Sequence, residues 1–353
     1  MIYVTLLICF VASILLTPLV KKLAFMIGAT DKPNYRKVHQ KIMPRMGGLA
    51  IFLSFAIGVL LLPIENTYLS AFLVGSIIIV ATGVLDDRFE LSAKVKLLGQ
   101  LAAALVVVVW GGVRVEFINL PFGGEIEFGI FSIPLTILWI VAITNAINLI
   151  DGLDGLAAGV SSIALMTISG MAIIKGDMFV AILGGILLAS TLGFLFYNFH
   201  PAKIFMGDTG ALFLGFAISV LSLLGYKNLT FISLIIPVII LGVPISDTIF
   251  AIIRRIVNKK PLSAPDKSHL HHCLLKAGFT HRQSVLVIYS IAALFGLAAV
   301  IFSMAKVWGS IILIAVLLLG IELFAEIVGL VGKDYKPLLK FMRHRLSGLA
   351  RNR

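Results

Sequence analysis

The sequence predicts an all-α protein that crosses a membrane many times. Of its 353 residues, 59% are hydrophobic and only 13% are charged, whereas an ordinary soluble domain is about half apolar and about a quarter charged. Apolar runs of about 18 residues or more, each long enough to cross the hydrocarbon core of a bilayer, recur along the whole chain. We therefore expect a single membrane domain over residues 1–353, held together by helix packing in lipid.

These runs predict about eleven transmembrane helices. The first run has no basic segment before it, so we do not expect a cleaved signal peptide. The expected spans are about 2–20, 47–64, 69–85, 95–112, 132–150, 156–174, 178–197, 209–225, 231–253, 284–304 and 307–329.

The distribution of lysine and arginine predicts the orientation, because cytoplasmic loops carry an excess of both. The loops after every odd-numbered span and the C-terminal tail hold all but four of the 29 Lys and Arg residues; the four exceptions are Arg114, Lys175, Lys227 and Lys306. We therefore expect the N-terminus outside and the C-terminus in the cytoplasm. Orientation and anionic lipid headgroups explain most of the net charge of +12, so nucleic-acid binding is not expected.

Two segments outside the spans have recognisable patterns. "GVRVEFINLPFGGEIEFGIFS" alternates apolar and polar residues on both sides of a turn, which predicts a small β-hairpin on the outer surface. The basic C-terminal segment, residues 330–353, predicts a cytoplasmic tail with a short amphipathic helix on the inner leaflet. Cys9 falls in a span and Cys273 in a cytoplasmic loop, so no disulfide framework is indicated.

Acidic residues gather at the cytoplasmic ends of the spans, where ionisable groups are costly and functional by default. Adjacent carboxylates repel each other and favour a bound cation, and hard oxygen ligands suit Mg²⁺. The alternatives are a solvated aspartate pair at a helix end and, for the last residue of the set, a helix N-cap. The set is Asp86 and Asp87 in "LDDRFELSAKVK", Asp151 and Asp154 in "NAINLIDGLDGLAAG", and Asp208 in "FMGDTGALFLG".

Basic and imidazole groups occupy other loops on the same face. Placed opposite a carboxylate-bound Mg²⁺, they describe a site for a diphosphate. Zinc is the rival interpretation of "HLHHC", but no second ligand cluster with suitable spacing follows, and aspartate oxygens do not favour zinc. The groups are His39, Lys41 and Arg45 before the second span, and Arg254, Arg255, Lys267, His269, His271 and His272 after the ninth.

The stretches "LDDRFELSAKVK", "NAINLIDGLDGLAAG", "FMGDTGALFLG" and "DKSHLHH", in this order on one membrane face, resemble the polyprenyl-phosphate N-acetylhexosamine-1-phosphate transferases over essentially the whole chain. The branch that transfers phospho-MurNAc-pentapeptide typically has three consecutive histidines and a DDxxK motif. Here the histidine motif is "HLHH", and Glu90 stands four residues after Asp86. The resemblance is therefore to the GlcNAc-1-phosphate branch, and most of all to the Gram-positive enzymes that begin the wall teichoic acid linkage unit.

This resemblance implies a reaction. UDP-GlcNAc would be the donor and undecaprenyl phosphate the acceptor, with UMP and GlcNAc-diphospho-undecaprenol as products, at a cytoplasmic site in the plasma membrane. Phosphoryl transfer needs alignment and charge neutralisation more than covalent help, so we expect direct displacement rather than an aspartyl-phosphate intermediate. A homodimer is left open, and a polytopic transporter, with polar residues near the midplane of several spans, is the alternative from another class.

The resemblance also implies roles for individual residues. Asp87 and Asp208 would bind Mg²⁺, with Mn²⁺ an acceptable substitute, and Asp86 would be a further ligand or would orient the acceptor phosphate. His271 and His272 would be catalytic. Asp247 receives no role, and its structural alternative is a pair with Arg254 or Arg255. The substrate-binding set would be Asn148, Asp151 and Asp154 toward the uridine end, Lys96, Lys267 and His269 toward the diphosphate, and Asn145, His39, Lys41 and Arg45.

Overall fold

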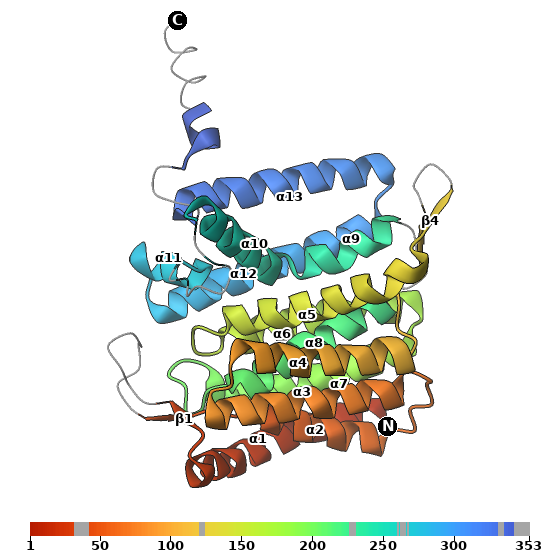
Figure 1. The fold of residues 1–353 in the computed structure, drawn as a ribbon, viewed down its shortest axis with the longest axis vertical. Helices are drawn as coiled ribbons and strands as arrows, with labels where there is room; N and C mark the ends of the chain where they lie inside the picture. The colour runs from red at the N-terminus through yellow and green to blue at the C-terminus, as the bar shows by residue number, and fades with distance from the viewer. Residues whose placement is uncertain are drawn as a thin grey trace, which may run out of the picture.

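The computed structural model is a bundle of helices that run roughly side by side (Figure 1). It describes residues 1–31, 42–119, 124–225, 231–259, 261, 266, 268–330 and 335–341. The helices are α1 (Ile2–Ile27), α2 (Gly48–Leu61), α3 (Leu69–Phe89), α4 (Ala93–Leu105) with a π-helical extension (Val106–Trp110), α5 (Ser132–Ile150), α6 (Leu156–Lys175), α7 (Met178–Asn198), α8 (Gly207–Leu224), α9 (Phe231–Ile240), α10 (Gly242–Val257), α11 (Leu270–Lys276), α12 (His281–Met304) and α13 (Val307–Val328).

Nine helical segments within the described residues are long and apolar enough to cross a membrane, in agreement with a polytopic membrane protein. The other two expected spans correspond to shorter helices. One is α2, with 14 residues. The span expected at 231–253 is divided into α9 and α10, because Pro244 has no amide hydrogen to donate to the Ile240 carbonyl. At the break, Gly242 packs so closely on α12 that an added Cβ would lie 2.6 Å from the Phe295 ring.

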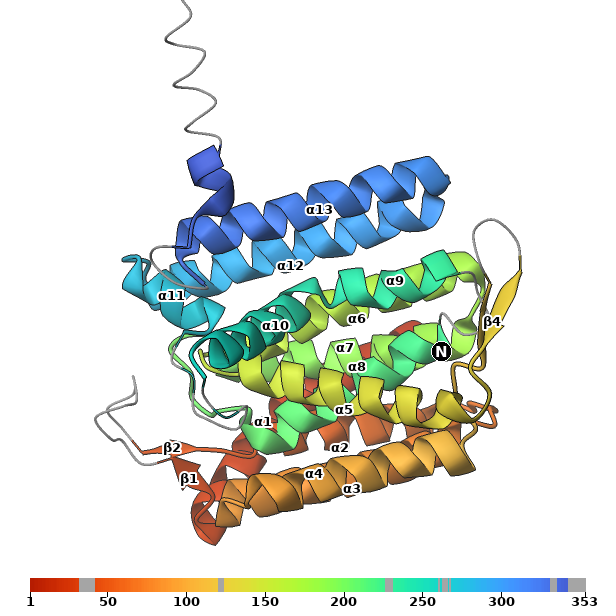
Figure 2. The same ribbon diagram turned by 45° about the horizontal axis from the view of Figure 1, so that its top comes forward.

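Two short antiparallel strand pairs lie at opposite ends of the bundle (Figure 2). β1 (Thr30–Asp31) pairs with β2 (Met43–Pro44). β3 (Phe117–Asn119) pairs with β4 (Glu125–Glu127) inside the segment expected to form a hairpin. We call the end that carries β1, β2 and α11 the site end, because the predicted site residues described below lie there.

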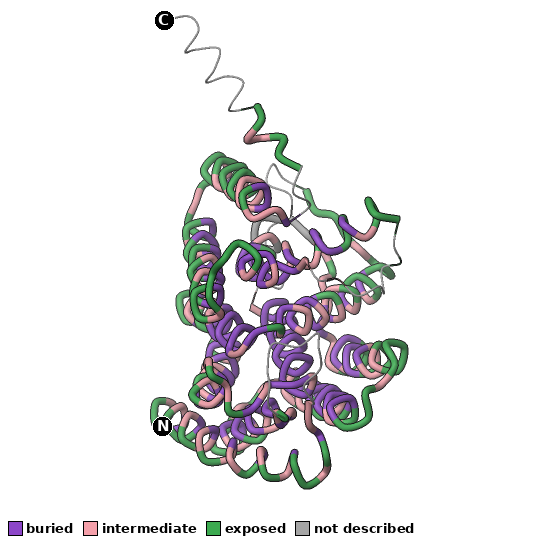
Figure 3. The backbone as a smooth tube through the Cα atoms, turned by 90° about the vertical axis from the view of Figure 1, so that its left-hand side faces the viewer, coloured by how far each residue is buried: buried purple, intermediate pink, exposed green. Residues whose placement is uncertain are grey.

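The central helix of the bundle is α8. Every residue of α8 except Asp208 is buried, and it packs against α2, α3, α5, α6 and α7. Aromatic rings fill the contacts, with Phe213 edge-on to Phe52 and Phe55, and Phe216 stacked on Phe72. The purple segments in Figure 3 show the same burial in the middle of the bundle, with exposed segments around the rim.

Glycines allow the N-terminus of α8 to approach its neighbours at backbone contact. A Cβ added at Gly48 in α2 would overlap the Cα of Gly210, and one at Gly83 in α3 would overlap the Cα of Thr209. Since backbone atoms cannot be moved as easily as the tip of a side chain, only glycine fits these two positions without shifting α8. The site end of α8 is therefore held against both α2 and α3.

This contact makes a prediction about stability. Gly48→Ala and Gly83→Ala should each lower the melting temperature of the purified protein, because overpacking of a tight contact costs about 1–3 kcal/mol. The matched control is Gly170→Ala in α6, where an added Cβ meets nothing within 4 Å and alanine is the better helix former. Tryptophan fluorescence against temperature in detergent would measure all three. Equal melting temperatures would contradict the backbone contact.

Candidate active site

The Asp87 carboxylate holds the start of α8. Its Oδ1 accepts the Asp208 N–H at 2.9 Å, and its Oδ2 accepts the Thr209 N–H at 3.0 Å and the Thr209 hydroxyl at 2.6 Å. Arg45 Nε lies 3.6 Å from Oδ1. The first N–H groups of a helix have no partner within the helix, so a carboxylate from α3 satisfies donors that are buried away from water. Gly207, at φ +71°, leaves space for this carboxylate, which a side chain would fill.

Asp208 belongs to a second set of contacts, made by its side chain. Lys96 Nζ lies 2.9 Å from Asp208 Oδ2 and 3.0 Å from Asp86 Oδ2, so one ammonium bridges two carboxylates. The Asn148 amide donates to Asp208 Oδ1. The side chain of Asp208 caps no N–H of its own helix, so the N-cap alternative is wrong. Four helices, α3, α4, α5 and α8, thus each contribute a side chain to one polar cluster.

Cationic side chains of the protein offset the expected repulsion between Asp86 and Asp87. Lys96 pairs with Asp86, and Arg45 lies beside Asp87. Among the residues that the structure describes, Asp86, Asp87 and Asp208 lie beside Arg45 and Lys96, and hard carboxylate oxygens are the donor set that Mg²⁺ favours. His39, Lys41 and Lys267, predicted to take part, lie outside the described residues.

The loop between α5 and α6 brings Asp151 next to this cluster. Burial, and then the charges of Asp208 and Asp87, raise the pKa of Asp151 from its usual 3.8 to about 7. The neighbouring Gly152 lies under the ring of His271, because an added Cβ would overlap that imidazole. The histidine motif and the "LIDGLDG" loop, far apart in the sequence, are therefore in contact.

Burial disfavours the charged form of the last two histidines of this motif. Burial and the neighbouring His272 lower the pKa of His271 to about 3, and burial also lowers the pKa of His272. The two rings lie at a centroid distance of 4.2 Å. Two neutral imidazoles can each donate and accept one hydrogen bond, and the predicted contact of these histidines with the diphosphate stays a prediction.

Asp154 takes part in a separate network. Its Oδ2 lies 2.8 Å from His200 Nδ1 and accepts the Ala202 N–H at 3.1 Å, and its backbone N–H donates to His281 Nε2 at 3.0 Å. Asp154, His200 and His281 each offer one possible ligand atom, and these atoms lie within 4.8 Å of one another. The network thus joins the α5–α6 loop to the segment after α7 and to the start of α12. Neither histidine was singled out from the sequence, because no spacing relates them to Asp154.

Asn145 also has a structural partner. Its Nδ2 donates to Gln100 Oε1 at 2.7 Å and to the Val141 carbonyl at 2.8 Å, while Gln100 donates back at 3.2 Å. This amide pair joins α4 to α5 one turn before Asn148. It uses both donors of Asn145, so substrate binding by this residue stays a prediction.

The remaining predicted groups lie around α11. His269 directly precedes α11 and binds Asp247. Of the two arginines suggested by the sequence as partners of Asp247, Arg254 instead binds Asp266. The described site residues thus form an aspartate–lysine cluster and a histidine helix, joined through the α5–α6 loop.

Comparison with known proteins identifies the family. The chain matches glycosyl transferase family 4 over residues 69–226. It is 55% identical to the "Probable undecaprenyl-phosphate N-acetylglucosaminyl 1-phosphate transferase" of Bacillus subtilis, over 95% of this chain and 96% of that protein. It is 38% identical to the "Decaprenyl-phosphate N-acetylglucosaminephosphotransferase" of Mycolicibacterium smegmatis, over 86% and 84% of the two chains. The chain therefore belongs to glycosyl transferase family 4, and the predicted resemblance is confirmed.

The raised pKa of Asp151 predicts a pH-dependent stability. A carboxyl whose pKa is raised on folding stabilises the folded state at low pH, and this contribution is lost as the pH rises toward 7. Asp151→Asn removes this dependence, so its melting temperature relative to the natural protein should rise between pH 5 and pH 8. Melting curves in EDTA would measure this, because a bound cation would lower the same pKa. A constant difference across this range would contradict the raised pKa.

Proposed function

We propose that the protein transfers GlcNAc-1-phosphate from UDP-GlcNAc to undecaprenyl phosphate. An oxygen of the acceptor phosphate attacks the sugar-linked phosphorus of the donor, a new P–O bond forms, the bond to the bridging oxygen breaks, and UMP leaves. The product is GlcNAc-diphospho-undecaprenol. We further propose that this product begins a cell-wall polymer of the wall teichoic acid type.

The observation that carries this proposal is the bridge of Lys96 between Asp86 and Asp208. It lies at one end of a membrane bundle, where a lipid phosphate and a soluble nucleotide can meet. The B. subtilis relative that is 55% identical over 95% of the chain bears the corresponding activity in its name. The fold, the polar cluster and the relative thus all favour a lipid-phosphate transferase.

The side chains of the cluster can take roles that suit this reaction. An acceptor phosphate has a second pKa of about 6 and is largely dianionic at neutral pH, so no strong general base is needed. Lys96 supplies positive charge at the point where two phosphates would approach each other. Asp86, held by the same ammonium, would orient the acceptor, and Asn148 holds the Asp208 carboxylate in place. Positioning and charge neutralisation are the main requirements of such a step.

The carboxylates also suit a divalent cation. Asp208 and Asp87 present hard oxygens that would hold Mg²⁺, with Mn²⁺ as a substitute and Asp86 as a further ligand, and the cation would neutralise the diphosphate charge. The oxygens of Asp87 also accept three hydrogen bonds from α8. Asp87→Asn would place an NH₂ group, which donates hydrogen bonds, against donors that need an acceptor. Asp208→Asn therefore tests the metal site more cleanly than Asp87→Asn does.

Purified protein with UDP-GlcNAc, undecaprenyl phosphate and Mg²⁺ should release UMP, measured by chromatography. EDTA should stop the release, and Asp208→Asn should reduce it by about 10²–10³-fold or more, because it removes a negative charge that would hold the cation. The control is Asp177→Asn, which removes a carboxylate that caps α7 at the opposite end of the bundle. UMP release by Asp208→Asn at the natural rate would reject the assignment.

The same assay separates the alternatives. UDP-MurNAc-pentapeptide should give negligible release, because a site that excludes a much larger donor by clash and unpaired polar groups discriminates strongly. Comparable release from both donors would move the protein to the peptidoglycan branch. A transporter would release no UMP from either donor.

We also propose that the site end faces the cytoplasm and the N-terminus faces outside. Cysteine labelling in intact cells tests this orientation. Lys94→Cys, exposed at the start of α4, should react with an impermeant maleimide only after the cells are opened. Thr67→Cys, exposed between α2 and α3 at the other end, should react in intact cells. The native Cys9 and Cys273 are buried and set the background. The reverse pattern would invert the proposed orientation.

A further inference from the structure

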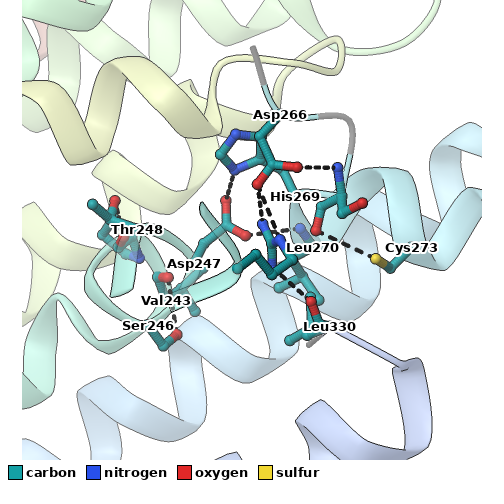
Figure 4. Close-up of polar contacts among 12 residues, drawn as sticks. Val243, Ser246, Asp247, Thr248, Asp266, His269, Leu270, Cys273 and Leu330 are labelled. Atoms are coloured by element: carbon teal, nitrogen blue, oxygen red, sulfur yellow. Dashed lines mark hydrogen bonds and ion pairs between the residues drawn. The ribbon is translucent and has the colours of Figure 1, made fainter. Parts of the chain in front are cut away.

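A buried carboxylate on α10 binds the first histidine of the "HLHH" motif (Figure 4). Asp247 and His269 are only 2% and 6% exposed. Oδ2 of Asp247 lies 2.8 Å from His269 Nδ1, and Oδ1 accepts the Leu270 N–H at 2.8 Å. The N–H groups of a first helical turn need acceptors from outside the helix. The same carboxylate therefore orients the imidazole and caps the start of α11.

The chemistry of this pair decides which ring nitrogen carries the hydrogen. An ionised carboxylate only accepts hydrogen bonds. Nδ1 of His269 therefore donates to Asp247, and in the neutral imidazole Nε2 is left as an acceptor. The tautomer thus follows from the partner of the ring.

A neighbouring ion pair holds the segment that precedes His269. Arg254 Nε donates to Asp266 Oδ2 at 3.0 Å, and another guanidinium nitrogen donates to the Leu330 carbonyl at 2.6 Å. The Ser268 N–H donates to Asp266 Oδ1 at 2.9 Å. Because Asp266 and Leu330 engage the guanidinium, the carboxylate of Asp247 is left for the histidine and the helix start.

This anchoring reaches the aspartate cluster through α11. The helix has only seven residues, so an anchor on its first turn also sets the position of His271. The rings of His269 and His271 are nearly parallel, at an interplanar angle of 4° and a centroid distance of 6.1 Å. His271 in turn covers Gly152, next to Asp151. Asp247 thus determines where the histidine motif meets the α5–α6 loop.

We propose that Asp247 is a positioning residue that holds His269 as the tautomer whose Nε2 accepts a hydrogen bond from the nucleotide-sugar donor. This inference rests on the proposed transferase function. A phosphate oxygen only accepts hydrogen bonds, so an acceptor nitrogen does not bind it. His269 therefore contacts a hydroxyl or N–H group of the sugar or nucleoside, and not the diphosphate, as the sequence had suggested.

Asp247→Asn tests this proposal with little change in shape. The asparagine carbonyl can still accept the Leu270 N–H, so the cap on α11 is retained. Its NH₂ group then faces His269 Nδ1, which must become the acceptor, and the hydrogen moves to Nε2. We expect an unchanged melting temperature and a KM for UDP-GlcNAc raised about tenfold, as for the loss of one well-placed hydrogen bond, with a smaller change in kcat.

A double-mutant cycle separates positioning from a general effect on the fold. If Asp247 acts through His269, Asp247→Asn should add little in a His269→Gln background, because residues that act as a unit are not additive. The control is Glu326→Gln. Glu326 is another fully buried carboxylate, and it accepts the N–H groups of Leu338 and Leu339. It should leave the KM for UDP-GlcNAc unchanged.

Histidine ¹⁵N spectra of the labelled protein in lipid nanodiscs give a readout without activity. The His269→Gln spectrum identifies the resonances of His269, which should report hydrogen on Nδ1 in the natural protein and on Nε2 in Asp247→Asn. A natural KM in Asp247→Asn, or additive effects in the cycle, would overturn the inference while UMP release stands. If the natural protein releases no UMP, the proposed function fails, and hydrogen on Nε2 in the natural protein would independently refute the tautomer.

Discussion

The cap that Asp87 places on α8 is the interaction on which the site depends. α8 is buried along almost its whole length, so water cannot satisfy the first N–H groups of the helix. A carboxylate from α3 supplies the acceptors, and this fixes both where α8 begins and which neighbours it contacts. Asp208, the second residue of α8, is thereby placed within reach of Lys96 from α4 and Asn148 from α5. The position of the polar cluster is thus a consequence of helix packing.

The polar contacts of the cluster are mutually dependent. Removing one member of a buried, hydrogen-bonded charge pair leaves the other charge uncompensated, at a cost of about 3–5 kcal/mol. Lys96 joins Asp86 to Asp208, and Arg45 approaches Asp87 from the segment before α2. Gly48 and Gly83 let α2 and α3 approach α8 closely, and this approach brings the pairs together. Substitutions of either kind, in the glycines or in the charges, act on the same contact between helices.

The sequence predicted the bundle and the gathering of aspartates because both follow from local patterns. Apolar length predicts a span, and an aspartate at a span end is conspicuous. The partners of these aspartates come from distant segments, which one sequence does not relate. Asp154 is an example, because His200 lies after α7 and His281 begins α12. Asn145 is another example. It lies one turn before Asn148 in the same motif, but its side chain binds Gln100 on α4, whereas Asn148 binds Asp208. The break between α9 and α10 was not predicted, because the length of an apolar run takes no account of Pro244.

Neighbours in these motifs have different roles for a geometric reason. Consecutive residues on a helix point about 100° apart, so Asp86 turns to Lys96 while Asp87 turns to α8. Asp247 repeats the role of Asp87 at a second place, since each is a carboxylate on one helix that accepts an N–H at the start of another. An aspartate in a membrane protein can thus be functional without meeting substrate. It can hold the first turn of the helix that presents the reactive group, and the accuracy of that placement limits the chemistry.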